Sequence, residues 1–221
     1  MLKSFLKADF HCHPLGDRYY PNPPDKLSDD DQKDIVSFLR AMAKTGVELL
    51  ACTDHNTVLS GLWAKEQARS QKLPLIVVPG AEINVWGHTQ RIHLLALNIK
   101  RNLSAGQLVL SQAIKEIHHQ GGVAVLAHPV KYPQEIISNP EIFLEIDGIE
   151  VNNTSEGVFQ TSGYLNDQSY YKDKFILQTT GSDLHWEPQN KISKGQFHPY
   201  FCVPTKWLLE KGIINIVDLL L

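Results

Sequence analysis

The stretch Ser4–His13, SFLKADFHCH, is an apolar run that ends in two histidines one residue apart. Successive side chains of a β-strand point to opposite faces, so His11 and His13 would lie on the same face. Two imidazoles on one face, about 7 Å apart, can bind one metal ion or two adjacent ions. The run therefore predicts a strand that carries metal ligands at its carboxyl end.

Six similar apolar runs follow, separated by helix-like segments. They are Val47–His55, Leu75–Asn84, Arg91–Ile99, Gly122–His128, Gly148–Asn152 and Phe175–His185. Nearly continuous apolar runs are typical of parallel strands that are covered on both faces. Their alternation with helices predicts an α/β fold with a mostly parallel sheet, and seven strands in 221 residues favour a closed or nearly closed barrel. No linker divides the sequence, so we expect one domain over residues 1–221.

Three segments have helical patterning. Ser28 and the three acids after it predict a helix start, because a hydroxyl caps the first turn and acids favour the positive end of the helix dipole. Gly46 would end this helix, and similar patterns cover Ser60–Gln71 and Ser104–Gln120. Pro14–Asp25 is a long loop that we expect to fold over the mouth of the barrel. The apolar stripe of the first helix consists of Ile35, Phe38, Leu39 and Met42.

Composition excludes several classes of protein. With 43% hydrophobic and 20% charged residues the chain can form a sizeable core, and a net charge of -3 provides no general attraction to nucleic acid or anionic membranes. No apolar run approaches the roughly 20 residues of a membrane span. Cys12, Cys52 and Cys202 have no motif spacing and indicate reduced thiols, so a cytoplasmic protein is expected.

Most of the ten histidines lie on the apolar runs, together with two acids, Glu82 and Asp183. The carboxyl ends of parallel strands build the active sites of such folds, so these side chains would converge. Imidazole and carboxylate suit Zn, Mn or Fe, and the set is too large for one ion, which predicts two or three divalent metals. The histidines in question are His11, His13, His55, His93, His128 and His185.

The remaining histidines fit other environments. His118 and His119 lie near the end of a helix and are expected to be structural or to face solvent. His88 lies in a turn, and His198 lies in the loop after the seventh run, over the expected mouth.

The blocks DFHCH, TDHN, GAEIN…HLLAL…AHP and GSDLH, in this order, resemble the PHP (polymerase and histidinol phosphatase) superfamily of metal-dependent phosphoesterases. The resemblance implies a distorted seven-stranded (β/α) barrel with a di- or trinuclear metal centre. The first metal would be bound by His11, His13, Glu82 and Asp183. The second would be bound by His55, His185 and a residue of the first loop, and the third by His93, His128 and a bridging Glu82.

The first loop departs from the family pattern. Arg18 occupies the position that usually supplies the loop ligand, and the nearest acid is Asp17, one residue earlier. Asp17 is therefore the expected ligand from this loop. Asp9 and Asp54 are expected to orient the first strand and His55, and Glu150 matches a further block as a structural or orienting acid.

Such a centre would hydrolyse a phosphoester with metal-activated hydroxide. The expected substrate is a phosphomonoester of a small metabolite or nucleotide, because metals outweigh the carboxylates and leave the pocket cationic. Candidates for the proton donor to the leaving group are Asp17, Asp54 and His198. Candidates for binding further phosphates are Arg18, Arg91, Lys191 and Lys194.

Two other readings stay open. A 3′–5′ exonuclease or end-processing nuclease would need a basic groove, and an interaction subunit would act with an ATPase partner or as a homo-oligomer. The apolar C-terminal stretch Ile213–Leu221 would either dock on the barrel or meet a partner chain. The only lysines for a groove are Lys172, Lys174, Lys191, Lys194 and Lys206.

Overall fold

A computed structural model describes residues 3–87, 89–103, 108–139, 141–158, 177–187, 191–194 and 201–219. The first half contains β1 (Phe5–His13), α1 (Asp29–Ala43), β2 (Leu49–Cys52), α2 (Leu59–Ser70), β3 (Ile76–Trp86), β4 (Arg91–Leu97) and α3 (Leu110–His119). The second half contains β5 (Val123–Leu126), η1 (Pro129–Lys131), α4 (Pro133–Ser138), α5 (Ile142–Glu145), β6 (Gly148–Asn153), β7 (Gly157–Val158), β8 (Leu177–Gly181), β9 (Leu184–Glu187), β10 (Lys191–Lys194), β11 (Phe201–Pro204), α7 (Thr205–Glu210) and η3 (Ile216–Leu219).

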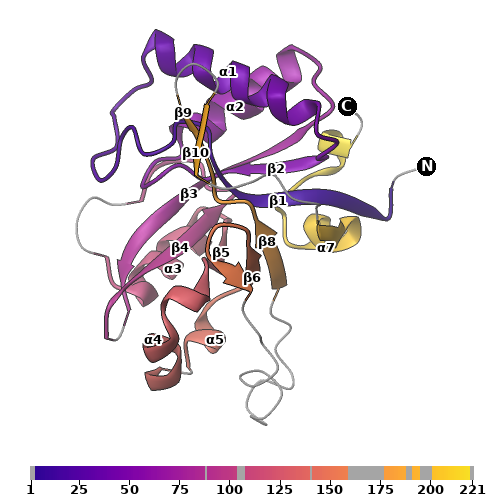
Figure 1. The fold of residues 1–221 in the computed structure, drawn as a ribbon. Coiled ribbons are helices and arrows are strands. Elements are labelled where there is room, and N and C mark those ends of the chain that lie inside the picture. The colour runs from indigo at the N-terminus through magenta and orange to yellow at the C-terminus, as the bar shows by residue number, and fades with distance from the viewer. Residues whose placement is uncertain are drawn as a thin grey trace.

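The strands form one curled sheet in the order β10-β9-β1-β2-β3-β4-β5-β6-β7, with β11 on β1 and β8 on β6 (Figure 1). β1 pairs in parallel with β2 and β9, and β6 pairs in parallel with β5 and β8. However, β4 is antiparallel to both β3 and β5. The fold is therefore mixed α/β with a half-barrel sheet.

The expectation of seven mostly parallel strands needs correction, because the sheet also contains the antiparallel strands β7, β10 and β11. Two of the expected runs differ as well. β3 and β4 form a hairpin, because Gly87 donates its N–H to the carbonyl of Gln90 at 2.8 Å and so short a turn permits only antiparallel pairing. The seventh expected run, Phe175–His185, divides at Ser182 and Asp183: β8 pairs with β6, whereas β9 pairs with β1. This division lets one stretch of chain join the two edges of the curled sheet.

Helices α1 and α2 cover one side of the sheet, and α4 and α5 lie at the opposite end of the molecule (Figure 1). The expected apolar stripe of α1 is buried against Cys12, Leu50 and Cys52. α1 begins as expected, because the Ser28 hydroxyl accepts the N–H of Asp31 and the Asp31 carboxylate accepts the N–H of Ser28. α3 begins at Leu110, whereas residues 104–107 lie outside the described residues.

The described part of the C-terminal stretch docks on the sheet through Ile213, Ile214 and the partly buried Leu219. Ile213 and Ile214 are buried in a core cluster with Leu6 and Val203, while Ile216 and Val217 are exposed. All three cysteines are free thiols. None of the helices in the described part of the chain has the length and apolarity needed to cross a membrane.

The capping box of α1 gives a testable prediction. Ser28→Ala removes the hydroxyl that caps the first turn, so the free energy of unfolding should fall by about 1 kcal/mol in urea denaturation. Ser70→Ala is the control, because the exposed Ser70 hydroxyl bonds only its own helix, to the carbonyl of Gln67. An equal loss in both variants would contradict the capping role.

Candidate metal centre

Seven side chains from the ends of the strands meet at one edge of the sheet. All but His93 are at most 10% exposed, and 21% of the His93 side chain is exposed. They are His11 and His13 on β1, His55 after β2, Glu82 on β3, His93 on β4, His128 after β5, and His185 on β9. Asp183, between β8 and β9, completes the cluster.

Glu82 lies at the middle of the cluster. Its Oε1 atom is 2.6 Å from His93 Nδ1 and 2.8 Å from His128 Nε2. Its Oε2 atom is 3.0 Å from His55 Nδ1 and 3.4 Å from His13 Nε2. Because each oxygen faces a different pair of histidines, this carboxylate can bridge two metal positions.

Two aspartates flank Glu82. The Oδ1 atom of Asp183 is 3.3 Å from His13 Nε2 and 3.2 Å from His185 Nε2. The Oδ1 atom of Asp17, which is on the first loop, is 3.3 Å from His55 Nε2 and 3.2 Å from His185 Nδ1. Asp17 is thus the acid of the first loop that reaches the cluster. The family pattern would take this ligand from position 18, where this chain has Arg18.

The donor atoms fit divalent metal ions. Three groups have ligand atoms within 4.8 Å of one another: His13, His55 and His185; His11, His13 and Asp183; and His11, Glu82 and His128. Within the described part of the chain, buried imidazole nitrogens of each group lack a hydrogen bond, among them Nε2 of His11 and of His13. A buried polar atom without a partner costs about 1–3 kcal/mol, which metal coordination would remove.

The charges of the cluster are balanced internally. Burial alone would raise the pKa of Glu82, but the neighbouring His93 and His11 hold it well below its usual value. Burial likewise opposes ionisation of Asp183, yet His11 and His13 hold its pKa well below the ordinary range. Both carboxylates are therefore ionised and available as ligands.

Three buried acids contact the residues that carry or adjoin the ligands of the cluster. Glu150 is 3.2 Å from His11 Nδ1 and accepts the backbone N–H of His128 at 2.8 Å. Asp9 accepts the N–H of His11, and Asp54 accepts the N–H of Leu15 at the start of the first loop. Burial raises the pKa of Asp9 and of Asp54 to about 6. Asp9 and Glu150 thus lie beside the first strand and its histidine, as expected, whereas the hydrogen bond of Asp54 goes to the first loop and not to the expected His55.

Backbone strain is concentrated at the same edge. Asn56, His128 and Asp183 have φ values of 57°, 28° and 50°, in the left-handed region that L-residues rarely adopt. Each stands where the chain turns away from a strand. At His128 and Asp183 this backbone conformation directs the side chain toward the cluster. No pattern in the sequence had indicated these positive φ values.

Other residues singled out in the sequence lie elsewhere. Arg18 does not face the cluster, because its guanidinium pairs with Asp31 and Asp34 of α1. His118 pairs with Asp147 at 2.7 Å and His119 is exposed, so both lie outside the cluster as expected. Lys191 and Lys194 are on β10, whereas their side chains, and the whole of His88, His198, Lys172 and Lys174, lie outside the described residues.

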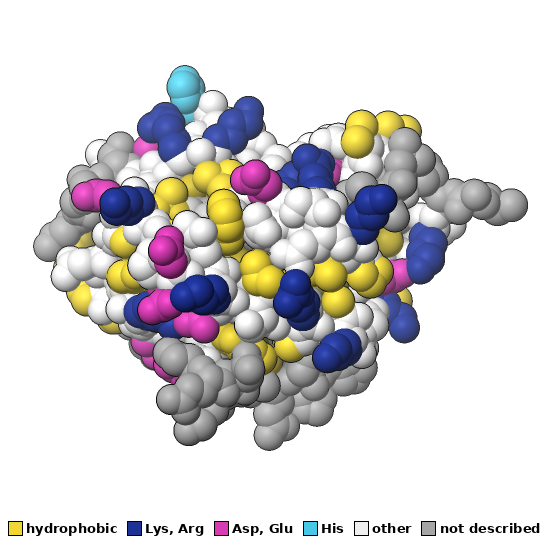
Figure 2. Space-filling model, turned by 90° about the horizontal axis from the view of Figure 1, so that it is seen from above, with side chains coloured by type: hydrophobic (Ala, Val, Ile, Leu, Met, Phe, Trp, Pro, Cys, Tyr) yellow, Lys and Arg dark blue, Asp and Glu magenta, His cyan; other side chains and the backbone are white. Residues whose placement is uncertain are grey.

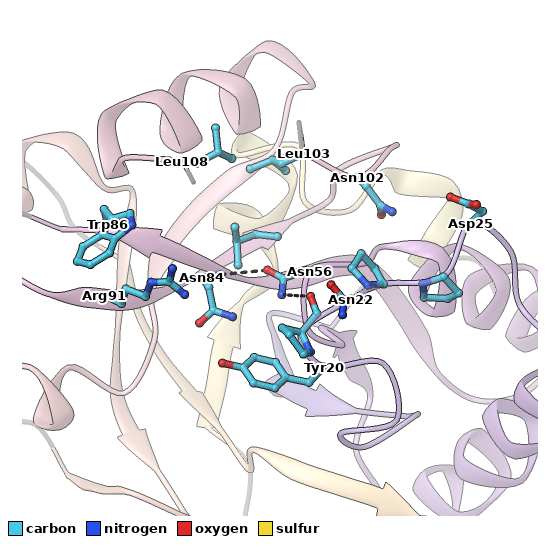
Figure 3. A pocket seen from close by; sticks show the side chains of 14 residues that line it. Tyr20, Asn22, Asp25, Asn56, Asn84, Trp86, Arg91, Asn102, Leu103 and Leu108 are labelled. Carbon is cyan, nitrogen blue, oxygen red and sulfur yellow. Dashed lines mark hydrogen bonds between the residues drawn. The ribbon is translucent and has the colours of Figure 1, made fainter. Parts of the chain in front are cut away.

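The sequence reasoning named Arg91 as a candidate for binding a phosphate, but it did not indicate the pocket of about 530 Å³ next to the cluster that Arg91 helps to line (Figure 3). Its lining includes Tyr20, Asn56, Asn84, Trp86 and Arg91. The Tyr20 ring centroid is 4.8 Å from that of His55. Asn56 and Asn84 are the last residues of the quoted blocks TDHN and GAEIN, so the signal was present in the sequence.

Comparison with known sequences finds relatives of low identity. No family model matches. An uncharacterized protein of Methanocaldococcus jannaschii is 27% identical over 185 residues, covering 82% of this chain and 99% of the relative. Tyrosine-protein phosphatase YwqE of Bacillus subtilis is 25% identical over 161 residues, which is 62% of this chain and 59% of the phosphatase.

Solved structures give a clearer match. A Bifidobacterium adolescentis protein, provisionally assigned as a metal-dependent phosphoesterase, superposes with a TM-score of 0.61 and 16% identity, over 98% of this chain and 99% of that one. A two-domain Bacteroides vulgatus protein with a PHP-like phosphoesterase part has a TM-score of 0.55 and 20% identity, over 83% of this chain and 54% of that one. The chain has a PHP-like fold.

A further solved structure also superposes on the chain. An amidohydrolase of Chromobacterium violaceum, with bound sulfate and no metal, has a TM-score of 0.58 and 17% identity. The match covers 92% of this chain and 96% of that chain. In this PHP-like chain the quoted sequence blocks supply all the side chains of the cluster.

Gly181 offers a test of how the cluster is supported. A Cβ atom at Gly181 would lie 2.2 Å from Glu150 Oε1 and 2.3 Å from His11 Cβ. Gly181→Ala should therefore lower the free energy of unfolding by about 1–3 kcal/mol and weaken metal uptake, as measured by urea denaturation and elemental analysis.

Gly121→Ala is the matched control. Gly121 has a φ of 74° but open space around its Cβ position, so only the backbone should be strained, by about 1 kcal/mol, with metal uptake unchanged. Normal metal uptake by Gly181→Ala would show that His11 and Glu150 tolerate displacement.

Proposed function

We propose that this chain is a metal-dependent hydrolase of phosphomonoesters. The observation that carries the proposal is the cluster around Glu82, in which three groups of histidine and carboxylate ligands share members. The fold is that of proteins described as metal-dependent phosphoesterases, and a curated relative is a phosphatase.

The proposed centre holds two or three divalent ions, of Zn, Mn or Fe. His11, His13, Glu82 and Asp183 would bind the first ion, and His55, His185 and Asp17 the second. His93, His128 and Glu82 would bind the third. When bound, such ions lower the pKa of water and offset negative charge on a phosphoryl group.

The protein's own residues would then orient the reaction. Water adds to phosphorus and gives up one proton, the P–O bond to the leaving group breaks, and the leaving oxygen takes up a proton. Asp17 is the best placed of the candidates for moving this proton, because its side chain is 63% exposed and still reaches the cluster. Its carboxylate would take the proton that the attacking water releases and pass it to the leaving oxygen. Asp54 is buried and bonded to Leu15, so it positions the first loop instead of meeting substrate.

A small substrate is favoured over a nucleic acid by the distribution of charge. Lysine and arginine side chains are interspersed with aspartate and glutamate on the face that α1 and α2 form (Figure 2). Arg18, a candidate for binding a phosphate, is neutralised by Asp31 and Asp34. A polynucleotide would need several phosphate contacts to unpaired cations, and the net charge of -3 also opposes its approach.

The metal requirement can be measured directly. Protein purified without chelator should contain two or three equivalents of transition metal and hydrolyse 4-nitrophenyl phosphate. Asp183→Asn should lose at least about a hundredfold in kcat/KM, because it removes a charged ligand next to His13 and His185.

His119→Ala is the control for this experiment, because His119 is exposed on α3 and lies outside the cluster. Its activity and metal content should match those of the wild type. Less than half an equivalent of metal in the wild type, with none regained in Mn or Zn, would refute the metal proposal.

Salt dependence separates a phosphatase from a nuclease. Turnover of a nucleotide or sugar-phosphate monoester should change little between low and physiological salt, because a guest held in a buried site is only weakly screened. Long DNA should be a poor substrate. Efficient DNA digestion that moderate salt suppresses and Asp183→Asn abolishes would favour the nuclease instead, and digestion only with an added ATPase would favour a catalytic subunit.

A further inference from the structure

The pocket missed by the sequence reasoning opens beside the cluster. It lies between the first loop, which contributes Tyr20, and the β3–β4 hairpin, which contributes Asn84, Trp86 and Arg91 (Figure 3). Asn84 is the partner of His93 in the β3–β4 ladder, so the pocket adjoins two ligand-bearing elements. A phosphoester bound at the cluster would therefore extend its leaving group into this space.

Size supports the same placement. The pocket has a volume of about 530 Å³, within the roughly 300–1,000 Å³ that is usual for small-molecule sites. A phosphate group alone would leave most of it empty. The pocket is large enough for a leaving group with a ring and further substituents.

Charge gives the pocket two different ends. Arg91 and Trp86 lie at one end and Asp25 at the other (Figure 3). Among the residues that the structure describes, Arg91 forms no ion pair, and its guanidinium lies 5.1 Å from the centroid of the Trp86 ring. An anionic group is thus favoured at the Arg91 end and repelled from the Asp25 end.

The hairpin that carries Arg91 is fixed at its turn. The Glu135 carboxylate of α4, which is fully buried, accepts the N–H and the hydroxyl of Thr89, both at 2.6 Å. Contact with the Trp86 ring restricts the guanidinium further. The backbone that carries Arg91 is therefore fixed, and the ring contact limits the positions of its exposed guanidinium, before a ligand arrives, which lowers the entropy cost of binding.

We propose that this pocket binds the leaving group of the substrate and selects one that carries an anionic group of its own, a carboxylate or a second phosphate, through Arg91. The assignment rests on the phosphoesterase function proposed above. Arg91 acts here as a specificity-determining residue, apart from the cluster at which the phosphoryl group reacts.

Aryl phosphates matched in shape test the proposal. The rate is measured for phenyl phosphates with a para carboxylate, a para phosphonomethyl group or a neutral para carboxamide. The wild type should prefer the anionic esters in kcat/KM by about tenfold or more, which corresponds to one charge-assisted hydrogen bond. In Arg91→Gln this preference should vanish, in Arg91→Lys part of it should remain, and in Arg40→Gln, a matched arginine on α1, it should persist.

Binding without turnover gives an independent readout. The corresponding benzylphosphonates cannot be hydrolysed, and titration calorimetry should show the carboxylate analogue binding about tenfold more tightly than the carboxamide, in the wild type but not in Arg91→Gln. Preference for only one of the two anions would identify which group Arg91 accepts. Equal kcat/KM and affinity for charged and neutral compounds would overturn the pocket assignment, whereas failure to hydrolyse any ester, with the binding preference intact, would overturn the proposed hydrolysis alone.

Discussion

A single buried carboxylate, that of Glu82, is what the arrangement of the strands depends on. It lies within 3.5 Å of nitrogens of five histidines, which are on β1 and β4 or just after β2 and β5: His11, His13, His55, His93 and His128. An ionised carboxylate without such partners would be costly to bury, so each strand must deliver its histidine to one place. The registers of β1 to β5 are therefore constrained in two ways. The hydrogen bonds of the sheet fix them, and so does the need to bring the histidines together around Glu82.

The sequence could predict what depends on local pattern. The apolar runs became strands, the stripe of α1 became its buried face, and the histidines at strand ends met at one edge. The direction of each strand was harder to predict, because it depends on the length and path of the segment that connects two strands and not on the apolar run that forms the strand. The turn at Gly87 and Gln90 makes β4 antiparallel, and the break at Ser182 sends β8 and β9 to different neighbours.

For the candidate site, the sequence could predict the ligand residues but not the conformation of the first loop or the neighbouring pocket. Its histidines and acids stand in short blocks whose spacing already carries the chemistry. The first loop has no such pattern, because contacts with residues outside the loop set its conformation. Asp54 accepts the N–H of Leu15, and Asp31 accepts a hydrogen bond from the Tyr19 hydroxyl. These contacts point Arg18 toward α1 and leave Asp17 facing the cluster. The neighbouring pocket depends on two loops remote in sequence, which no local pattern links.

The position of β1 in the sheet has a consequence for synthesis of the protein. This strand is synthesised before the other strands of the sheet, yet it pairs with β9 and β11, which end at residues 187 and 204. Asp183 and His185 reach the cluster only with β9. The ligands on β1 therefore cannot complete the centre until β9 has been synthesised. Of the three ligand groups, a nascent chain could at first assemble the one formed by His11, Glu82 and His128.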